Sequence, residues 1–269
     1  MKRFKTVHYT IHSNKIKDAR GIRFAVIADL HGMEFGPDNR KLLETIHRYR
    51  PDGILIAGDM IVRNDPASLK TASSLLSSLA QQYPVYYALG NHEYKLYRTD
   101  LQENCMAARY QEYEKALKTA GIHILHNESC SLQVGKTSLT VYGLEIPLIY
   151  YKKPFSPQLR REEVRELIGE PSSDSLNILL AHSPKYGDTY FDWGADLILS
   201  GHYHGGIVRL GRHNGLLSPQ LHPFPKFCCG DFHRKDQHML VSAGAGEHTI
   251  PVRIHNPREL LMVDLKSSD

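Results

Sequence analysis

The sequence predicts an α/β protein with a four-layer α/β/β/α sandwich, in which two mixed β-sheets pack face to face and helices flank them. Three observations lead to this expectation. Residues 22–120 alternate short apolar runs with helix-like patterns, whereas the remaining half is richer in strand-like runs. Blocks that contain Asp, Asn or His follow many of these runs, and open α/β sheets place their ligand sites at such strand ends.

Length and composition narrow the class of protein. A chain of 269 residues suits one large domain, so residues 1–269 are expected to form a single domain. The net charge of +4 comes from mixed stretches without a basic tract, so no nucleic-acid partner is expected. The basic N-terminus leads into no signal peptide, and no apolar run reaches the roughly 20 residues that span a bilayer. With four cysteines and no CxxC pair, these features predict a cytoplasmic protein with reduced thiols and no transmembrane segment.

The first half is expected to alternate strands with helices. The predicted strands, each a short apolar or alternating run, are 7–12 at a sheet edge, 22–28, 53–57 and 85–89. The predicted helices, which carry apolar residues at helical spacing, are 38–49, 66–82 and 102–120. Asp38 is the expected N-cap of the first of these helices.

The second half is expected to contain more strands. These are 122–125, 130–134, 138–144, 176–181, 195–199, 239–243 and 259–264. Gly135-Lys136 fits a two-residue hairpin turn, and residues 158–168 fit a helix. Residues 213–238 contain several prolines and are expected to be a loop.

Histidine is the compositional outlier, with 16 residues, and several fall in motif-like blocks. Five blocks each follow a predicted strand: Asp29-Leu30-His31, Gly58-Asp59, Gly90-Asn91-His92-Glu93, His182, and Gly201-His202-Tyr203-His204-Gly205. They contain two carboxylates, one amide and four imidazoles that suit metal ligation, a mixture typical of Mn, Fe or Zn. Seven ligands suffice for two divalent ions if one carboxylate bridges them, and such pairs catalyse in-line displacement at phosphorus.

The order D-x-H, G-D, G-N-H-E, H, G-H-x-H resembles the signature of the calcineurin-like metallophosphoesterases, over residues 22 to about 205. The tail, with Gly205-Gly206, Ser218-Pro219-Gln220 and Asn256-Pro257-Arg258-Glu259, resembles a bacterial branch that is often membrane-anchored. That branch is generally assigned phosphodiesterase or phospholipid-related activity. This chain differs from the branch because it shows no anchor segment.

The resemblance implies a role for each block. Asp29, His31 and His204 are expected to hold one metal, and Asn91, His182 and His202 the other, with Asp59 bridging both. His92 is expected to be a catalytic residue that stabilises or protonates the leaving oxygen, while a metal-bridging hydroxide attacks phosphorus. Glu93 is expected either to orient His92 or to form an ordinary surface salt bridge.

The expected function is therefore hydrolysis of a phosphate ester, with a phosphodiester favoured over a monoester by the resemblance. A protein or nucleotide phosphatase, a nuclease and a non-catalytic scaffold on the same fold are the alternatives. The aromatic and basic segment 148–155 is either a loop over the sheet edge or a cap that contacts substrate. A peripheral contact with a membrane also stays open.

Overall fold

Two six-stranded mixed sheets form the centre of the structure, a computed structural model that describes residues 2–99, 105–152, 155–206, 208–211, 214–215, 224–247 and 252–268. The first sheet has the order β1-β14-β2-β3-β4-β5, formed by Lys5–His12, Glu259–Lys266, Ile22–Ile27, Gly53–Ala57, Val85–Ala88 and His123–Ile124. The second has the order β12-β13-β9-β8-β7-β6, formed by Gly230–Arg234, Gln237–Val241, Leu197–Ser200, Leu176–Ala181, Thr137–Leu144 and Ser129–Val134. A small ribbon pairs β10 (Arg209–Leu210) with β11 (Asn214–Gly215).

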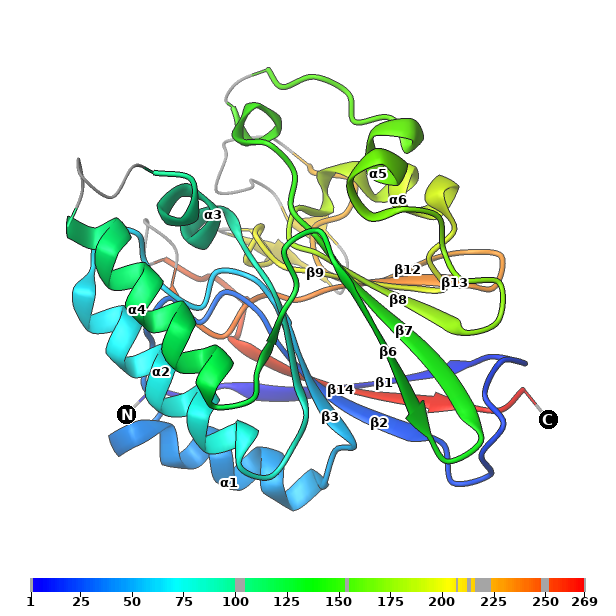
Figure 1. The fold of residues 1–269 in the computed structure, drawn as a ribbon, viewed down its shortest axis with the longest axis horizontal. Helices are drawn as coiled ribbons and strands as arrows, with labels where there is room; N and C mark the ends of the chain where they lie inside the picture. The colour runs from blue at the N-terminus through cyan, green and yellow to red at the C-terminus, as the bar shows by residue number, and fades with distance from the viewer. Residues whose placement is uncertain are drawn as a thin grey trace.

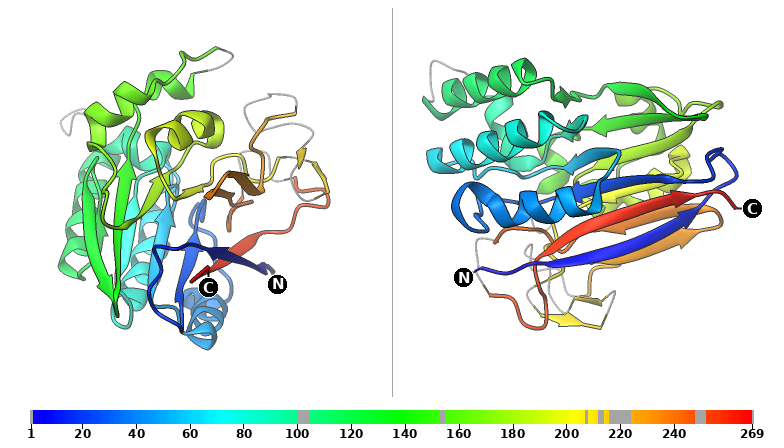
Figure 2. Two further views of the ribbon diagram at one scale, coloured as in Figure 1. Left: turned by 90° about the vertical axis from the view of Figure 1, so that its right-hand side faces the viewer. Right: turned by 90° about the horizontal axis from the view of Figure 1, so that it is seen from below.

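Helices lie outside both sheets (Figure 1). The α-helices are α1 (Arg40–Tyr49), α2 (Pro66–Ala80), α3 (Asn91–Tyr97), α4 (Cys105–Thr119), α5 (Arg161–Ile168) and α6 (Gly187–Trp193). Short 3₁₀ turns are η1 (Pro37–Asn39), η2 (Leu148–Tyr151) and η3 (Pro184–Tyr186). Seen from two further sides, α1, α2 and α4 cover the first sheet, and β1 runs beside β14 (Figure 2). The predicted four-layer α/β/β/α sandwich is confirmed.

Three hydrophobic cores separate the four layers, and the strands show why. Along β3, Ile54 and Ile56 face α1, α2 and α4, whereas Leu55 faces the second sheet. Along β8, Ile178 faces the first sheet and Leu179 faces α5 and α6. Successive side chains of a strand point to opposite faces, so strands covered on both faces are apolar throughout. Because single strands contribute side chains to two neighbouring cores, the packing supports one domain over residues 1–269. The single domain stays a prediction.

The segments that follow the central strands of both sheets lie at one shared edge. In the first sheet β2, β3 and β4 are parallel, and in the second sheet β8 and β9 are parallel. Each of these strands ends at one of the five blocks found in the sequence. The blocks therefore meet where the two sheets converge. No helix within the described ranges is long and apolar enough to cross a bilayer.

The structure corrects several expected elements. Asp38 does not cap a helix, because it lies inside η1 with φ 51° and Asn39 occupies the cap position. Residues 230–238 are not loop, because β12 pairs with β13 as an antiparallel hairpin. β12 lies at the edge of its sheet and is polar, so it lacks the apolar signal of a central strand.

Other boundaries also shift. The helix expected at 158–168 begins at Arg161, and the strand expected at 195–199 begins at Leu197. The short helices α3 and α6 were not expected. The start of the helix expected at 102–120 and the motif at residues 218–220 lie outside the described residues. The hairpin turn is confirmed, since Gly135 has φ 55° between β6 and β7.

Candidate metal centre

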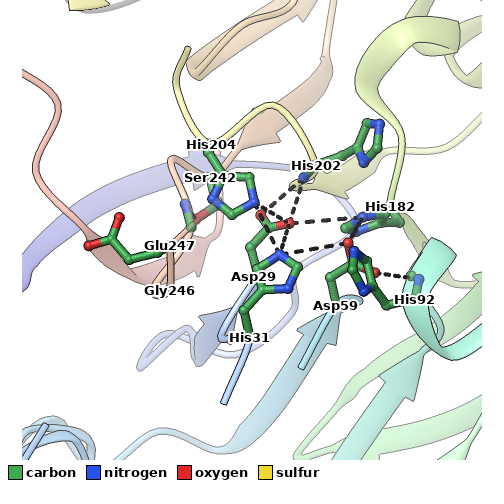
Figure 3. A network of polar contacts seen from close by, with 12 residues as sticks. Asp29, His31, Asp59, His92, His182, His202, His204, Ser242, Gly246 and Glu247 are labelled. Atoms are coloured by element: carbon green, nitrogen blue, oxygen red, sulfur yellow. Dashed lines mark hydrogen bonds and ion pairs between the residues drawn. The ribbon is translucent and has the colours of Figure 1, made fainter. Parts of the chain in front are cut away.

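All seven predicted ligand residues and His92 lie in the segments that follow the strand ends at the shared sheet edge. Asp29 and His31 follow β2, Asp59 follows β3, and Asn91 begins α3 after β4. His182 follows β8, and the pair His202 and His204 follows β9. Figure 3 shows Asp29, His31 and His204 pointing toward one another, with Asp59 and His182 beside them. Segments nearly 180 residues apart thus form one cluster.

Five of the seven expected ligands have a positive φ angle, a backbone conformation that residues other than glycine rarely adopt. Their φ angles are 52° at Asp29, 47° at His31, 53° at Asp59, 67° at His202 and 49° at His204. Each such residue costs free energy, and such residues gather at functional sites. The chain therefore accepts strain here in order to turn these side chains toward a common point.

A glycine on the neighbouring strand end makes room for Asp59. A Cβ atom at Gly90 would lie 2.1 Å from Asp59 Oδ1, so only glycine fits there. The N–H of His92, two residues later, donates to Asp59 Oδ1 at 2.9 Å. The third block thus packs directly onto the second and fixes one oxygen of Asp59.

The first group of ligand atoms comprises Asp29, His31 and His204, whose donor atoms all lie within 4.8 Å of one another. His31 Nε2 lies 3.2 Å from His204 Nε2, and His204 Nε2 lies 3.4 Å from Asp29 Oδ1. The backbone N–H of His202 donates to both oxygens of Asp29, at 2.9 and 3.0 Å. This carboxylate is fully buried and held in place by the loop that carries two of the imidazoles.

The second group comprises Asp59, His182 and His202, again with donor atoms within 4.8 Å of one another. His182 Nε2 lies 3.1 Å from Asp59 Oδ2, which in turn lies 3.8 Å from His31 Nε2. Asp59 therefore stands between the two groups. Asn91 Oδ1 is buried and has no hydrogen-bond partner among the described residues, so it is free to accept a ligand interaction.

Hydrogen bonds to the protein fix which ring nitrogen of two histidines faces the cluster. His182 Nδ1 lies 2.7 Å from the carbonyl oxygen of Ala57, which can only accept, so His182 donates and presents its Nε2 lone pair. His92 Nδ1 instead accepts from the backbone N–H of Arg63 at 3.0 Å. His92 therefore presents Nε2–H. One ring is prepared to bind a cation and the other to donate a proton.

Glu93 does not orient His92 and is not a surface salt bridge. Its side chain is fully buried, and its two oxygens accept from the N–H groups of Asp59, Gly90 and Ile61 at 3.0, 3.0 and 3.1 Å. The hydroxyl of Tyr87 donates to it at 2.9 Å. Glu93 therefore supports the backbone on either side of Asp59. The contacts of Tyr87 and of the Arg63 backbone had no signal in the sequence.

Burial and mutual contact set the charges of the cluster. Burial raises the pKa of Asp29 to about 7, and His182 only partly opposes this. Burial would also raise the pKa of Asp59, but His182 and His92 outweigh it and hold that pKa well below its usual range. Two carboxylates buried side by side are costly unless positive charge compensates them. Divalent cations supply such charge.

The donor set therefore fits divalent metal ions. It offers carboxylate and amide oxygens together with imidazole nitrogens, a mixture that suits first-row transition metals. Two groups of ligand atoms meet at Asp59, and the amide oxygen of Asn91, next to His92 in the chain, is buried without a hydrogen-bond partner among the described residues. His92 belongs to a third group with His31 and Asp59, so its ring lies close to one member of each of the other two groups.

The aromatic segment before α5 reaches the cluster. The ring of Tyr151, the last residue of η2, lies edge-on to the ring of His202 at 5.2 Å. The expected contact of a cap at 148–155 with substrate stays a prediction, and residues 153–154 lie outside the described residues.

Comparison with known proteins agrees with the motif order. The family model described as calcineurin-like phosphoesterase matches residues 22–206, more than two thirds of the 269-residue chain. A metallophosphoesterase of Caenorhabditis elegans is 28% identical over 281 residues, which cover 96% of this chain and 53% of that protein. A metallophosphoesterase of Campylobacter jejuni is 27% identical over 261 residues, which cover 92% of this chain and 60% of that protein. The chain thus spans between half and three fifths of these relatives.

Among solved structures, a Staphylococcus aureus protein described as a 5'-nucleotidase superposes with a TM-score of 0.53 at 13% identity. The match covers 93% of this chain and 55% of that one. At this identity the likeness concerns the fold alone.

Proposed function

Because the chain belongs to the calcineurin-like phosphoesterase family, we propose that it hydrolyses a phosphate ester with the help of two divalent metal ions. The first ion would be held by Asp29, His31 and His204, the second by Asn91, His182 and His202, and both by Asp59. Mn, Fe or Zn would suit these donors. The observation that carries the proposal is that Asp59 lies beside both ligand groups, each of which combines residues from the two sheets.

The protein's own groups prepare the reaction. Two bound ions would supply an activated water for in-line attack on phosphorus and neutralise the phosphoryl oxygens. Asp29 and Asp59 are held by the backbone N–H groups of His202 and His92 before substrate arrives, so little reorganisation is needed. His92 presents Nε2–H and would give this proton to the leaving oxygen, as a general acid.

A phosphodiester is the proposed substrate, on the strength of the family resemblance of the motifs and tail. A phosphomonoester is the alternative. A non-catalytic scaffold is disfavoured, because all seven expected ligand residues are present in the sequence and six of them lie in the two ligand groups. The net charge of +4 without a basic tract gives no support for a nucleic-acid substrate.

A substrate panel tests the proposal. The purified chain, loaded in turn with Mn²⁺, Fe²⁺ and Zn²⁺, is assayed with bis-p-nitrophenyl phosphate, p-nitrophenyl phosphate, glycerophosphodiesters and single-stranded DNA. Hydrolysis of bis-p-nitrophenyl phosphate and the glycerophosphodiesters in preference to the monoester and to DNA is expected, and Asp59→Asn should abolish it. Protein that binds two ions yet hydrolyses none of these esters would contradict the proposed activity. Faster hydrolysis of the monoester would overturn only the proposed substrate.

A further inference from the structure

A segment beyond the family-matched region packs against the candidate metal centre. We call residues 242–247 and 252–258, which lie between β13 and β14, the C-terminal brace. Its backbone bonds the first ligand block, with Ala245 N–H donating to Ala28 O at 2.9 Å and Gly246 N–H donating to Asp29 O at 2.6 Å. A Cβ atom at Gly244 would lie 2.9 Å from Asp29 Cβ, so the brace touches the ligand itself. The brace therefore packs directly against the first ligand block of the candidate metal centre.

The side chain of Arg253 connects the brace to the loop that carries His204. Its guanidinium donates to the carbonyl oxygens of Ala243 at 2.8 Å and Gly246 at 2.6 Å. Nη2 also lies 3.2 Å from Nδ1 of His204, and Nη1 lies 3.5 Å from the carbonyl oxygen of His204. Only 11% of the side chain is exposed, and Nε lies 3.4 Å from Glu247 Oε2. One planar group thus joins the brace to a predicted metal ligand.

Asn256 holds the same loop from its other side. Its side-chain amide donates to the carbonyl oxygens of His204 at 2.5 Å and Gly206 at 2.7 Å. It is buried, and its Oδ1 would lie 2.5 Å from a Cβ atom at Gly205. The carbonyl groups that follow the left-handed turn at His204 therefore find partners in the brace instead of in secondary structure.

From these contacts we propose that Arg253, supported by Asn256, is a positioning residue that fixes the backbone of the His204 loop for the first metal ion. This inference rests on the proposed two-metal function. A cation next to a metal site repels the ion, so charge alone would not place an arginine here. The value of Arg253 is its planar fork, which joins two brace carbonyls to the carbonyl oxygen of His204. Its approach to His204 Nδ1 does not itself prepare the ring, because a guanidinium only donates and a donor at Nδ1 leaves the proton of a neutral ring on Nε2. A lysine carries the same charge but not this geometry.

Metal binding to the metal-free protein tests the inference without relying on activity. Mn²⁺ titration calorimetry should show two ions bound per chain in the unmodified protein. Arg253→Met and Arg253→Lys should both weaken one binding step by about 10- to 100-fold, the range typical for loss of a residue that orients a ligand, and leave the other step unchanged. The Lys variant also serves if the Met variant does not fold.

Arg23→Met provides a matched control. Arg23 donates to both oxygens of Asp264, between β2 and β14 but at the end remote from the centre, at 2.6 and 3.0 Å. Its loss should lower the unfolding temperature and leave both Mn²⁺-binding steps unchanged.

Three results would overturn parts of the argument in different ways. Two unchanged binding steps in both Arg253 variants would reduce Arg253 to a structural residue. Tighter binding in Arg253→Met with unchanged binding in Arg253→Lys would show that charge, and not position, is what Arg253 contributes. An unmodified protein that binds no metal would instead contradict the proposed function.

Discussion

The imidazole Nδ1 of His92 accepts a hydrogen bond from the backbone N–H of Arg63 at 3.0 Å. Since a backbone N–H can only donate, this contact leaves the proton of the neutral ring on Nε2. Arg63 lies on the loop that follows Asp59, so the same loop carries the predicted bridging ligand and orients the predicted acid. The ring of His92 lies edge-on to that of His31 at 5.0 Å, within reach of the cluster.

Substitutions of Asp59 and of His92 should separate catalysis from metal binding. Asp59→Asn should abolish hydrolysis and lose metal, because a bridging carboxylate becomes a neutral amide. His92→Ala should lower kcat by about 10²- to 10⁴-fold, the usual contribution of a general acid, and keep both ions. Metal content is measured by elemental analysis on the same samples. Loss of both ions in His92→Ala, to the extent seen in Asp59→Asn, would make His92 a ligand instead.

Replacing Glu93 by Gln should destabilise the fold. The amide nitrogen of Gln would face backbone N–H groups that now donate to carboxylate oxygens. Loss of these buried bonds should lower the free energy of unfolding by roughly 2–4 kcal/mol, measured by urea denaturation. Tyr87→Phe is the matched control, because it removes one donor to Glu93 and should cost only about 1 kcal/mol. Equal costs for the two variants would argue against this account.

A charged histidine outside the ligand groups should make stability depend on pH. Burial would lower the pKa of His126, but hydrogen bonds to Glu114 at 2.9 Å and Glu145 at 2.8 Å outweigh it and raise the pKa to about 9. The ring also stacks on Tyr97 at 4.4 Å, and Lys118 pairs with Glu114. The cluster joins the ends of α3 and β7 to α4.

The sign follows from a folded-state pKa above the unfolded value of about 6.5. The contribution of His126 is fully present below pH 6.5 and is lost as pH rises through about 9. Its full size is at most about 3 kcal/mol. Urea denaturation between pH 6 and 10 should show this decline, and His126→Gln should flatten it. The exposed His123, replaced by Gln, is the control; an equal flattening there would contradict the assignment.

Metal removal should lower stability. An ion that binds only the folded chain stabilises it by about 2.7 kcal/mol at 100 times its dissociation constant. Treatment with EDTA should therefore lower the unfolding temperature, and Mn²⁺ should restore it. The shift should be absent in Asp59→Asn. An identical shift in that variant would mean that the ion binds elsewhere.

The sequence predicted the layers better than the details of the site. Ile22–Ile27, Gly53–Ala57 and Leu176–Ala181 are apolar except at the second residue of the first and third strands, because helices or a second sheet cover both faces, and such runs are easy to recognise. The polar edge strand β12 and the seven-residue helix α3 have no such signal. The left-handed conformation of Asp29 or His204 is equally invisible, since contacts made elsewhere impose it.

By itself, the sequence determined the α/β class, the order of the five blocks and the family to which they point, because these depend on residue type and spacing along the chain. Only the tertiary structure decided how the donor atoms divide around Asp59, that Glu93 supports backbone instead of His92, and that Arg253 and Asn256 hold the His204 loop. The hydrogen bonds of Glu93 to Asp59 and of Asn256 to His204 join residues 34 and 52 positions apart, and the ligand pair His31 and His204 is 173 positions apart. They follow from the packing of the two sheets, which no local pattern encodes.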